Sequence, residues 1–147
     1  MSITIQLASA VAAELAQATL TEPFDAVMAV LPVYKLEDLD GVKVTVRPAD
    51  IEITGATRSY GQWDIAVEIC VQQRIGSDMD RNTRVVELAA LIEEIADHLR
   101  CKKLASAEFA TWLNCTIAPL YDPGHLQDHN VFTGRLEVSY RIMTNGK

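Results

Sequence analysis

The sequence has no excess of basic residues. Its 147 residues include 13 Lys and Arg against 20 Asp and Glu, which gives a formal net charge of -7. A protein that binds nucleic acid tightly neutralises phosphates with a basic surface. The composition therefore argues against direct, tight nucleic-acid binding.

Cysteines, aromatic residues and long hydrophobic runs are also scarce. Cys70, Cys101 and Cys115 are an odd number with no short-spaced pair, so we expect free thiols in a reducing compartment. No apolar run approaches the roughly 18 residues of a membrane span, and the first apolar stretch lacks the basic region of a secretory signal. Aromatic residues make up 6% and hydrophobic residues 49% of the chain. The expected core is aliphatic, and the length suits one domain over residues 1–147.

A strand followed by a helix is the clearest pattern in the chain. From Trp63 to Val71 every second residue is large and apolar, while Asp64 and Glu68 fall on the opposite face. Residues 83–100 then carry apolar side chains at three- and four-residue steps, which predicts an amphipathic helix. We expect the apolar faces of strand and helix to pack on each other.

The remaining elements predict an α+β fold, with a mainly antiparallel or mixed sheet of about five strands and two helices packed on one face. Pro48 is expected to end one strand before Ile51 begins the next, and the segment with Pro123 and Gly124 is expected to be a polar connection. The other expected elements are a helix at 4–20, a strand covered on both sides at 24–34, a turn at 37–41, a strand at 42–47, a hairpin loop at 55–61, and strands at 110–120 and 132–142.

Metal-ligand residue types cluster at one place only. His125, Asp128 and His129, with Asp122 upstream, could hold zinc if the two histidines shared a helical face. Because Pro123 and Gly124 favour a loop, a solvated turn is the preferred interpretation. We therefore expect no metal, no cofactor and no catalytic residue, and we expect that the chain is not an enzyme.

Two acidic turns are candidate contact regions for partners. Asp78 and Asp80 resemble the start of a calcium loop, but the glycine and distal glutamate of such a loop are missing. Asp80 or Asn82 is expected to cap the following helix. Polar loop tips on a rigid sheet commonly bind partners. The candidate contact residues are Glu37, Asp38, Asp40, Asp78, Asp80 and Arg81.

Several sequence segments, by their order and spacing along the chain, resemble the tail terminator and neck proteins of long-tailed bacteriophages and prophages. They cover most of the chain, and none is a catalytic signature. The segments are IQLASAVAAEL at 5–15, LPVY at 31–34, VQQRIGSD at 71–78, EEIADHLR at 93–100 and PLYDPGHL at 119–126, followed by Phe132 and Tyr140.

The resemblance implies a structural virion protein of the tail or neck, assembled in the host bacterial cytoplasm. Such a subunit forms a homo-oligomeric ring, commonly a hexamer, on the head-proximal end of the tail tube. The ring ends tube polymerisation and offers the docking surface for the head. Its implied partners are other copies of the chain, the tail tube protein and a head-completion or connector protein. DNA would pass through the lumen without specific binding, and no membrane is involved.

Two alternatives stay open at this point. Within the same class, the chain could be a head-completion or head-to-tail connector protein of the neck. From a different class, it could be a small metal-binding protein or hydrolase centred on His125, Asp128 and His129.

Overall fold

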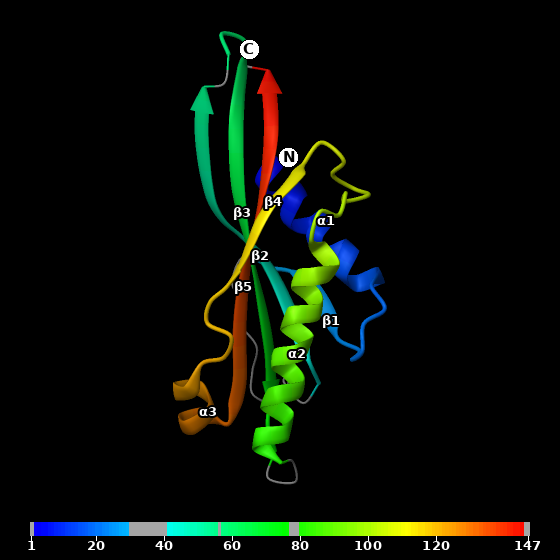
Figure 1. Ribbon diagram of the computed structural model, residues 1–147, viewed down its shortest axis with the longest axis vertical. Coiled ribbons are helices and arrows are strands. Elements are labelled where there is room, and N and C mark those ends of the chain that lie inside the picture. Colours follow the sequence, from blue (N-terminus) through cyan, green and yellow to red (C-terminus); the bar gives the residue numbers. More distant parts are fainter. Residues whose placement is uncertain (1, 30–40, 56, 77–79, 146–147) are drawn as a thin grey trace.

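The computed structural model describes residues 2–29, 41–55, 57–76 and 80–145, which form three helices and a five-stranded sheet (Figure 1). Across the sheet the strand order is β1-β2-β3-β5-β4; β1 and β2 are parallel and every other neighbouring pair is antiparallel. The predicted α+β fold with a mixed sheet is confirmed. The elements are α1 (Ile3–Gln17), β1 (Asp25–Met28), β2 (Lys43–Gly55), β3 (Tyr60–Arg74), α2 (Arg81–Leu99), β4 (Thr111–Ile117), α3 (Pro123–His129) and β5 (Val131–Asn145).

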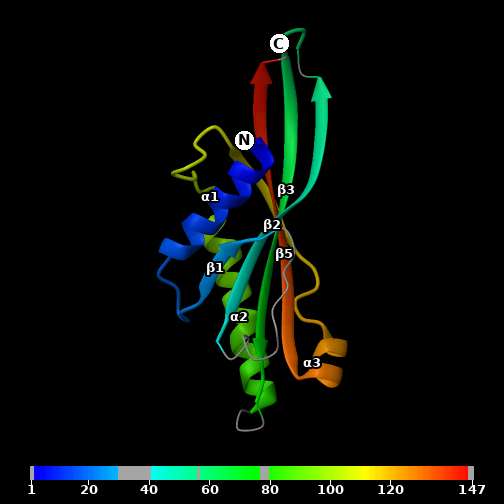
Figure 2. The same ribbon diagram turned by 180° about the vertical axis from the view of Figure 1, so that it is seen from behind.

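Helices α1 and α2 cover the same face of the sheet, and the core lies between them and the strands (Figures 1 and 2). Ile65, Val67 and Ile69 of β3 point into this core and are fully buried. On the opposite face Glu68 accepts hydrogen bonds from Arg47. The apolar stripe of α2 belongs to the same core, although α2 itself lies mainly over β5 and β4. Both apolar faces are therefore buried in one core, but the expected packing of the two faces directly on each other is not what the structure shows, because α2 contacts mainly β5 and β4.

Gly134 lets α2 approach β5 closely. A Cβ atom at this position would clash with the side chain of Ile92 and with the backbone carbonyl of Leu120. The first contact comes from the helix stripe and the second from the connection that follows β4. A residue without a side chain is therefore required where three segments meet.

Two predicted strands differ from the structure. β2 does not end at Pro48 but continues to Gly55 through an irregularity between Pro48 and Asp50. Proline removes a backbone donor, which an edge position or a bulge tolerates. The strand expected to be covered on both sides is only Asp25–Met28, where exposed and half-buried residues alternate. It lies at the edge of the sheet, and the rest of that prediction falls on residues 30–34, outside the described ranges.

A third helix replaces the polar connection that the sequence predicted. Asp122 caps α3 by accepting hydrogen bonds from the backbone N–H groups of Gly124, at 2.9 Å, and His125, at 3.2 Å. Pro123 stands in the first turn, where its missing N–H group costs nothing, because helical N–H groups there have no partner within the helix. Asn130 then takes a left-handed conformation, with φ of 56°, that ends the helix before β5. The expectation of a loop at this position was wrong.

Three strands project beyond the rest of the molecule. We call the tongue the part of β2, β3 and β5 beyond the end of β4, which comprises residues 53–55, 60–63 and 142–145. Figures 1 and 2 show this part extending past both large helices. The predicted hairpin between β2 and β3 is confirmed, since Gly55 pairs with Gly61 at the tip.

Candidate functional site

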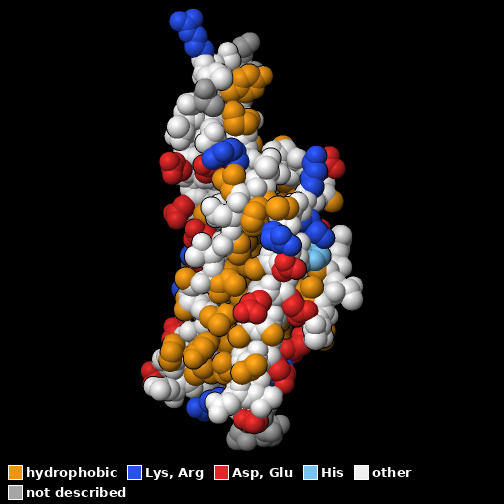
Figure 3. Space-filling model, in the orientation of Figure 1, with side chains coloured by type: hydrophobic (Ala, Val, Ile, Leu, Met, Phe, Trp, Pro, Cys, Tyr) orange, Lys and Arg blue, Asp and Glu red, His pale blue; other side chains and the backbone are white. Residues whose placement is uncertain are grey.

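An apolar groove runs along α2 on the side that faces β4 and the connection from β4 to α3. Its larger part has a volume of about 580 Å³ and is bounded by the N-terminal half of α2 and by residues 120–126. Figure 3 shows hydrophobic side chains gathered along this face of the molecule. Val86 is 68% exposed and Tyr121 is 40% exposed. Contiguous apolar surface of this kind is typical of protein–protein contact.

The groove continues along α2 beside β4. A second hollow of about 360 Å³ extends from Glu93 to Arg100 on the helix and is bounded across from it by Trp112, Cys115 and Ile117. These three β4 side chains remain partly exposed, because β4 is the outermost strand. β4 has seven residues and β5 has fifteen, so β4 covers only part of the edge of β5.

β4 also has an open backbone edge. It is the last strand of the sheet, and its sequence TWLNCTI contains neither a charged residue nor proline. Edge strands that do not pair with other chains usually carry such protection. The open edge lies next to the groove, so backbone hydrogen bonding and apolar burial are available to a partner side by side.

The tongue carries further exposed apolar side chains. Ile53, Tyr60 and Met143 are 60%, 48% and 50% exposed, and Ile51 just below them on β2 is 44% exposed. Ile53 pairs across the sheet with Trp63, so it lies on the face that the helices cover lower down. On the opposite face Arg141 binds Asp64 through two hydrogen bonds, which holds the pKa of the Asp64 carboxyl below its usual value.

The predicted contact residues are only partly placed by the structure. Asp80 is the N-cap of α2, and its carboxylate accepts hydrogen bonds from the backbone of Asn82 and the hydroxyl of Thr83. This confirms the predicted cap. Arg81 borders the groove and donates to the Asn130 side chain at 2.5 Å. Four further candidates fall outside the described residues: Glu37, Asp38, Asp40 and Asp78.

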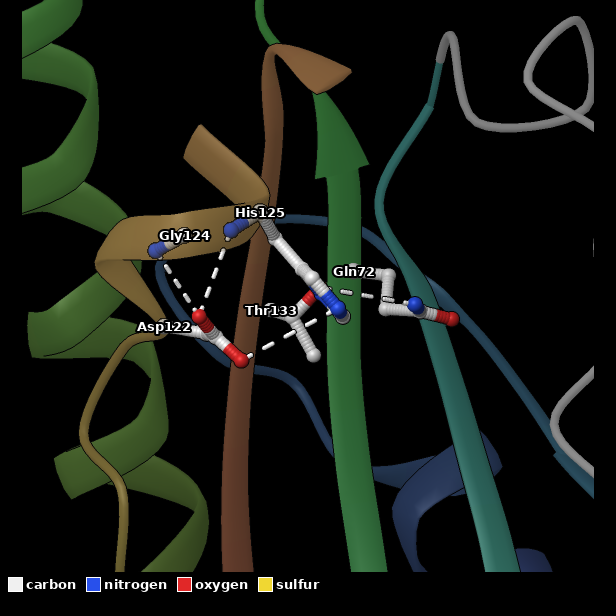
Figure 4. A network of polar contacts seen from close by, with 5 residues as sticks. All are labelled: Gln72, Asp122, Gly124, His125 and Thr133. Carbon is white, nitrogen blue, oxygen red and sulfur yellow. Dashed lines mark hydrogen bonds and ion pairs between the residues drawn. The ribbon is translucent and has the colours of Figure 1, made fainter. Parts of the chain in front are cut away.

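The histidine cluster forms a structural network rather than a set of open ligands (Figure 4). The Nδ1 atom of His125 lies 2.9 Å from the Thr133 hydroxyl oxygen, which also accepts a long hydrogen bond of 3.5 Å from Gln72. Its Nε2 atom lies 3.9 Å from Asp122. Thr133 is only 1% exposed. The network therefore ties α3 to β5 and β3 from the sheet face away from α1 and α2, while Leu126 of the same helix borders the groove along α2.

His129 and Asp128 do not complete a metal site with His125. The two imidazole rings stand edge to face with centroids 6.1 Å apart. Across the described ranges, no group of three or more His, Cys, Asp or Glu side chains could hold a metal ion.

The three cysteines are free thiols in different surroundings. Burial raises the pKa of Cys70 and of Cys115, while Cys101 is exposed just beyond the end of α2. The Nε2 atom of His98, near the end of α2, lies 3.1 Å from the carboxylate of Glu14 in α1.

Sequence reasoning missed both the groove and the tongue. A signal for the tongue was available, because Ile51 and Ile53 resume the alternation past Pro48, shifted by the one residue that the irregularity between Pro48 and Asp50 absorbs. No local sequence pattern predicts the groove, because its extent depends on where β4 ends along the edge of β5.

Comparison with known proteins leaves the family open. No protein-family model matches this chain, and no curated protein matches it significantly. None of the described helices is long and apolar enough to cross a membrane.

Proposed function

We propose that this chain is the tail terminator of a long-tailed bacteriophage or prophage. Copies form a ring, of six subunits by the resemblance of the sequence, at the head-proximal end of the tail tube. One face of the ring binds the tube protein and stops its polymerisation, and the other face receives the head-completion or connector protein. This work requires contact surfaces and no chemical reaction.

The observation that carries the proposal is that one sheet supports several exposed surfaces that could contact other proteins. The groove along α2, the bare edge of β4 and the apolar tongue are all exposed in a single copy. The edge of β4 and the tongue belong to one continuous sheet, and the groove lies between α2, which packs on that sheet, and the segment that follows β4. A subunit that must contact several neighbours at once needs this arrangement.

The charge of the chain supports the same proposal. A lumen through which DNA passes must not retain it, and negative charge repels phosphate. With a formal net charge of -7, six copies place a large negative charge around such a channel.

The decisive experiment removes the chain from a phage or prophage that encodes it. Without a terminator, tail tubes should grow beyond their normal length and should not join to filled heads, as seen by electron microscopy. Tails of normal length beside unjoined heads would identify a connector instead. Normal infectious particles would overturn the proposal.

The groove gives a variant with a matched control. Val86→Lys places a charge on the apolar surface of α2 at a position that is 68% exposed. It should leave the fold intact and reduce assembly, measured by native mass and by particle yield. Gln17→Lys is the matched control. It also replaces an uncharged residue with lysine, at an exposed position of α1 away from the groove, so it should assemble normally. Equal behaviour of the two variants would exclude the groove as a contact surface.

A further inference from the structure

We infer that copies of this chain join head to tail through their sheets, the β4 edge of one copy pairing with the free edge of β2 in the next. The inference rests on the proposed ring and names the contact that builds it. Contacts between two different patches generate rings when the rotation closes.

Among the described residues, the sheet has one open edge on each side. β4 is the outermost strand on one side. On the other side β1 pairs only with residues 43–46 of β2, so residues 47–55 form a second open edge within the described part of the chain. Open edges of this kind are templates for pairing with another chain.

The two open edges lie at the same height on the sheet. Thr111 pairs with Arg141, Arg141 pairs with Asp64, and Asp64 pairs with Glu52. The four residues therefore form one row from edge to edge. A second copy placed beside the first without sliding brings its Glu52 next to Thr111. From β2 to β4 every neighbouring pair is antiparallel, and this placement continues the alternation.

The apolar faces also match in this arrangement. Trp112 pairs with Tyr140, Tyr140 with Ile65, and Ile65 with Ile51, so Trp112 and Ile51 lie in one row on the face that α1 and α2 cover. Ile51 is 44% exposed in the single copy. Pairing would set it against Trp112 of the neighbour, which borders the groove. The apolar core would then continue from one subunit into the next.

Charge complementarity favours β4 as the partner of β2. The hollow that Thr111 borders has two cations and one acid, Lys102, Lys103 and Glu108, so its charge is positive on balance. Glu52 lies across the sheet from Thr111 in the same row. Neither Lys103 nor Glu52 has an ion-pair partner among the residues that the structure describes. The inferred contact brings the two together between copies that otherwise repel each other through their net negative charge.

The β2 edge is protected against pairing with itself. Pro48 lacks a backbone donor, and Asp50 and Glu52 would face the same acids of a second β2 edge. The β4 edge offers no such repulsion. Past Pro48, residues 50–53 of β2 remain able to pair with the beginning of β4.

Disulfide cross-linking tests the contact directly in the full chain. In a Cys101→Ser, Cys115→Ala background, Glu52→Cys and Thr111→Cys are introduced together. Within one copy three strand spacings, about 14 Å, separate these positions, whereas a disulfide requires Cα atoms about 4.4–6.8 Å apart. Mild oxidation should therefore produce a ladder of covalent oligomers up to the ring size on a denaturing gel. Neither single variant should produce this ladder, and neither should Thr111→Cys combined with Arg58→Cys.

The other outcomes separate this inference from the proposed function. A wild-type chain that is monomeric by native mass and does not assemble on tail tubes contradicts the ring itself. If the wild-type chain forms a ring but the double-cysteine variant gives no ladder, the ring is retained and the β4–β2 contact is overturned. Covalent dimers from Thr111→Cys alone would show that two β4 edges pair around a two-fold axis instead.

A charge exchange provides the second measurement. Glu52→Lys raises the net charge by two and Lys103→Glu lowers it by two, so a general charge effect would act in opposite directions. We expect each change to weaken assembly about fivefold, and the double variant to recover to within about twofold of the wild type. A double variant as weak as the product of the two single effects would overturn the contact.

Discussion

At the scale of single residues, Gly134 limits how closely the helix layer and the sheet can approach. Its neighbours are the Ile92 side chain, which can shift, and the Leu120 carbonyl, which belongs to the backbone and yields less easily. Gly134→Ala should therefore lower the free energy of unfolding by about 1–3 kcal/mol, measured by urea denaturation. Gly55→Ala is the matched control, because nothing lies within 4 Å of a Cβ atom there. Equal stabilities of the two variants would mean that α2 does not press on Gly134.

Tyr140 is a buried residue whose hydroxyl has no hydrogen-bond partner in the described part of the chain. Burial also raises the pKa of this phenol, which keeps it neutral over the range in which the protein is handled. Leaving a buried polar group unpaired costs about 1–3 kcal/mol. Tyr140→Phe should therefore leave the thermal midpoint unchanged or raise it, while Tyr121→Phe at the exposed groove should have no effect. A loss of more than about 1 kcal/mol would reveal a partner for the Tyr140 hydroxyl.

At the scale of elements, the buried stripe of α2 carries the contact between the helix layer and the sheet. Ile92 is fully buried over Gly134, so Ile92→Ala should cost about 2–5 kcal/mol of unfolding free energy. Val86→Ala on the same helix removes an exposed side chain and should cost less than about 0.5 kcal/mol. Denaturant titration of both variants separates packing from helix propensity. A loss below half a kilocalorie for Ile92→Ala would place that residue outside the core.

The elements with a strong period were predictable from sequence, because burial on one face imposes the alternation of β3 and the stripe of α2. Elements that depend on context were not. Pro48 interrupts a strand pattern, but only the pairing of β2 with β3 on both sides of the irregularity shows that the strand continues past it. Pro123 was interpreted as a loop signal, although Asp122 followed by proline also begins a helix. The surfaces were harder still, since the groove exists because β4 ends before β5 does.

At the scale of the whole molecule, the tongue should be separable from the folded core. Replacing residues 54–62 with Asn-Gly joins Ile53 and Trp63, which already face each other across the hairpin, through a two-residue turn. The described residues that this removes are exposed or half-buried. The shortened chain should therefore unfold with a free energy close to that of the full chain. Under the proposed function it should fail to complete tails, as measured by particle yield, and normal particles would remove the tongue from the assembly.

The long pairing of β3 with β5 also determines how the subunit responds to pulling. The two strands stay in register over their full lengths, from Tyr60 opposite Asn145 to Arg74 opposite Val131. Hydrogen bonds between antiparallel strands run perpendicular to the strand axis. A load that pulls β3 at the tongue and β5 at the base along that axis therefore acts on these bonds together, in shear, rather than on one bond after another. A joint built from such subunits transmits tension from its projecting end to its base as a stiff rod does, with little extension.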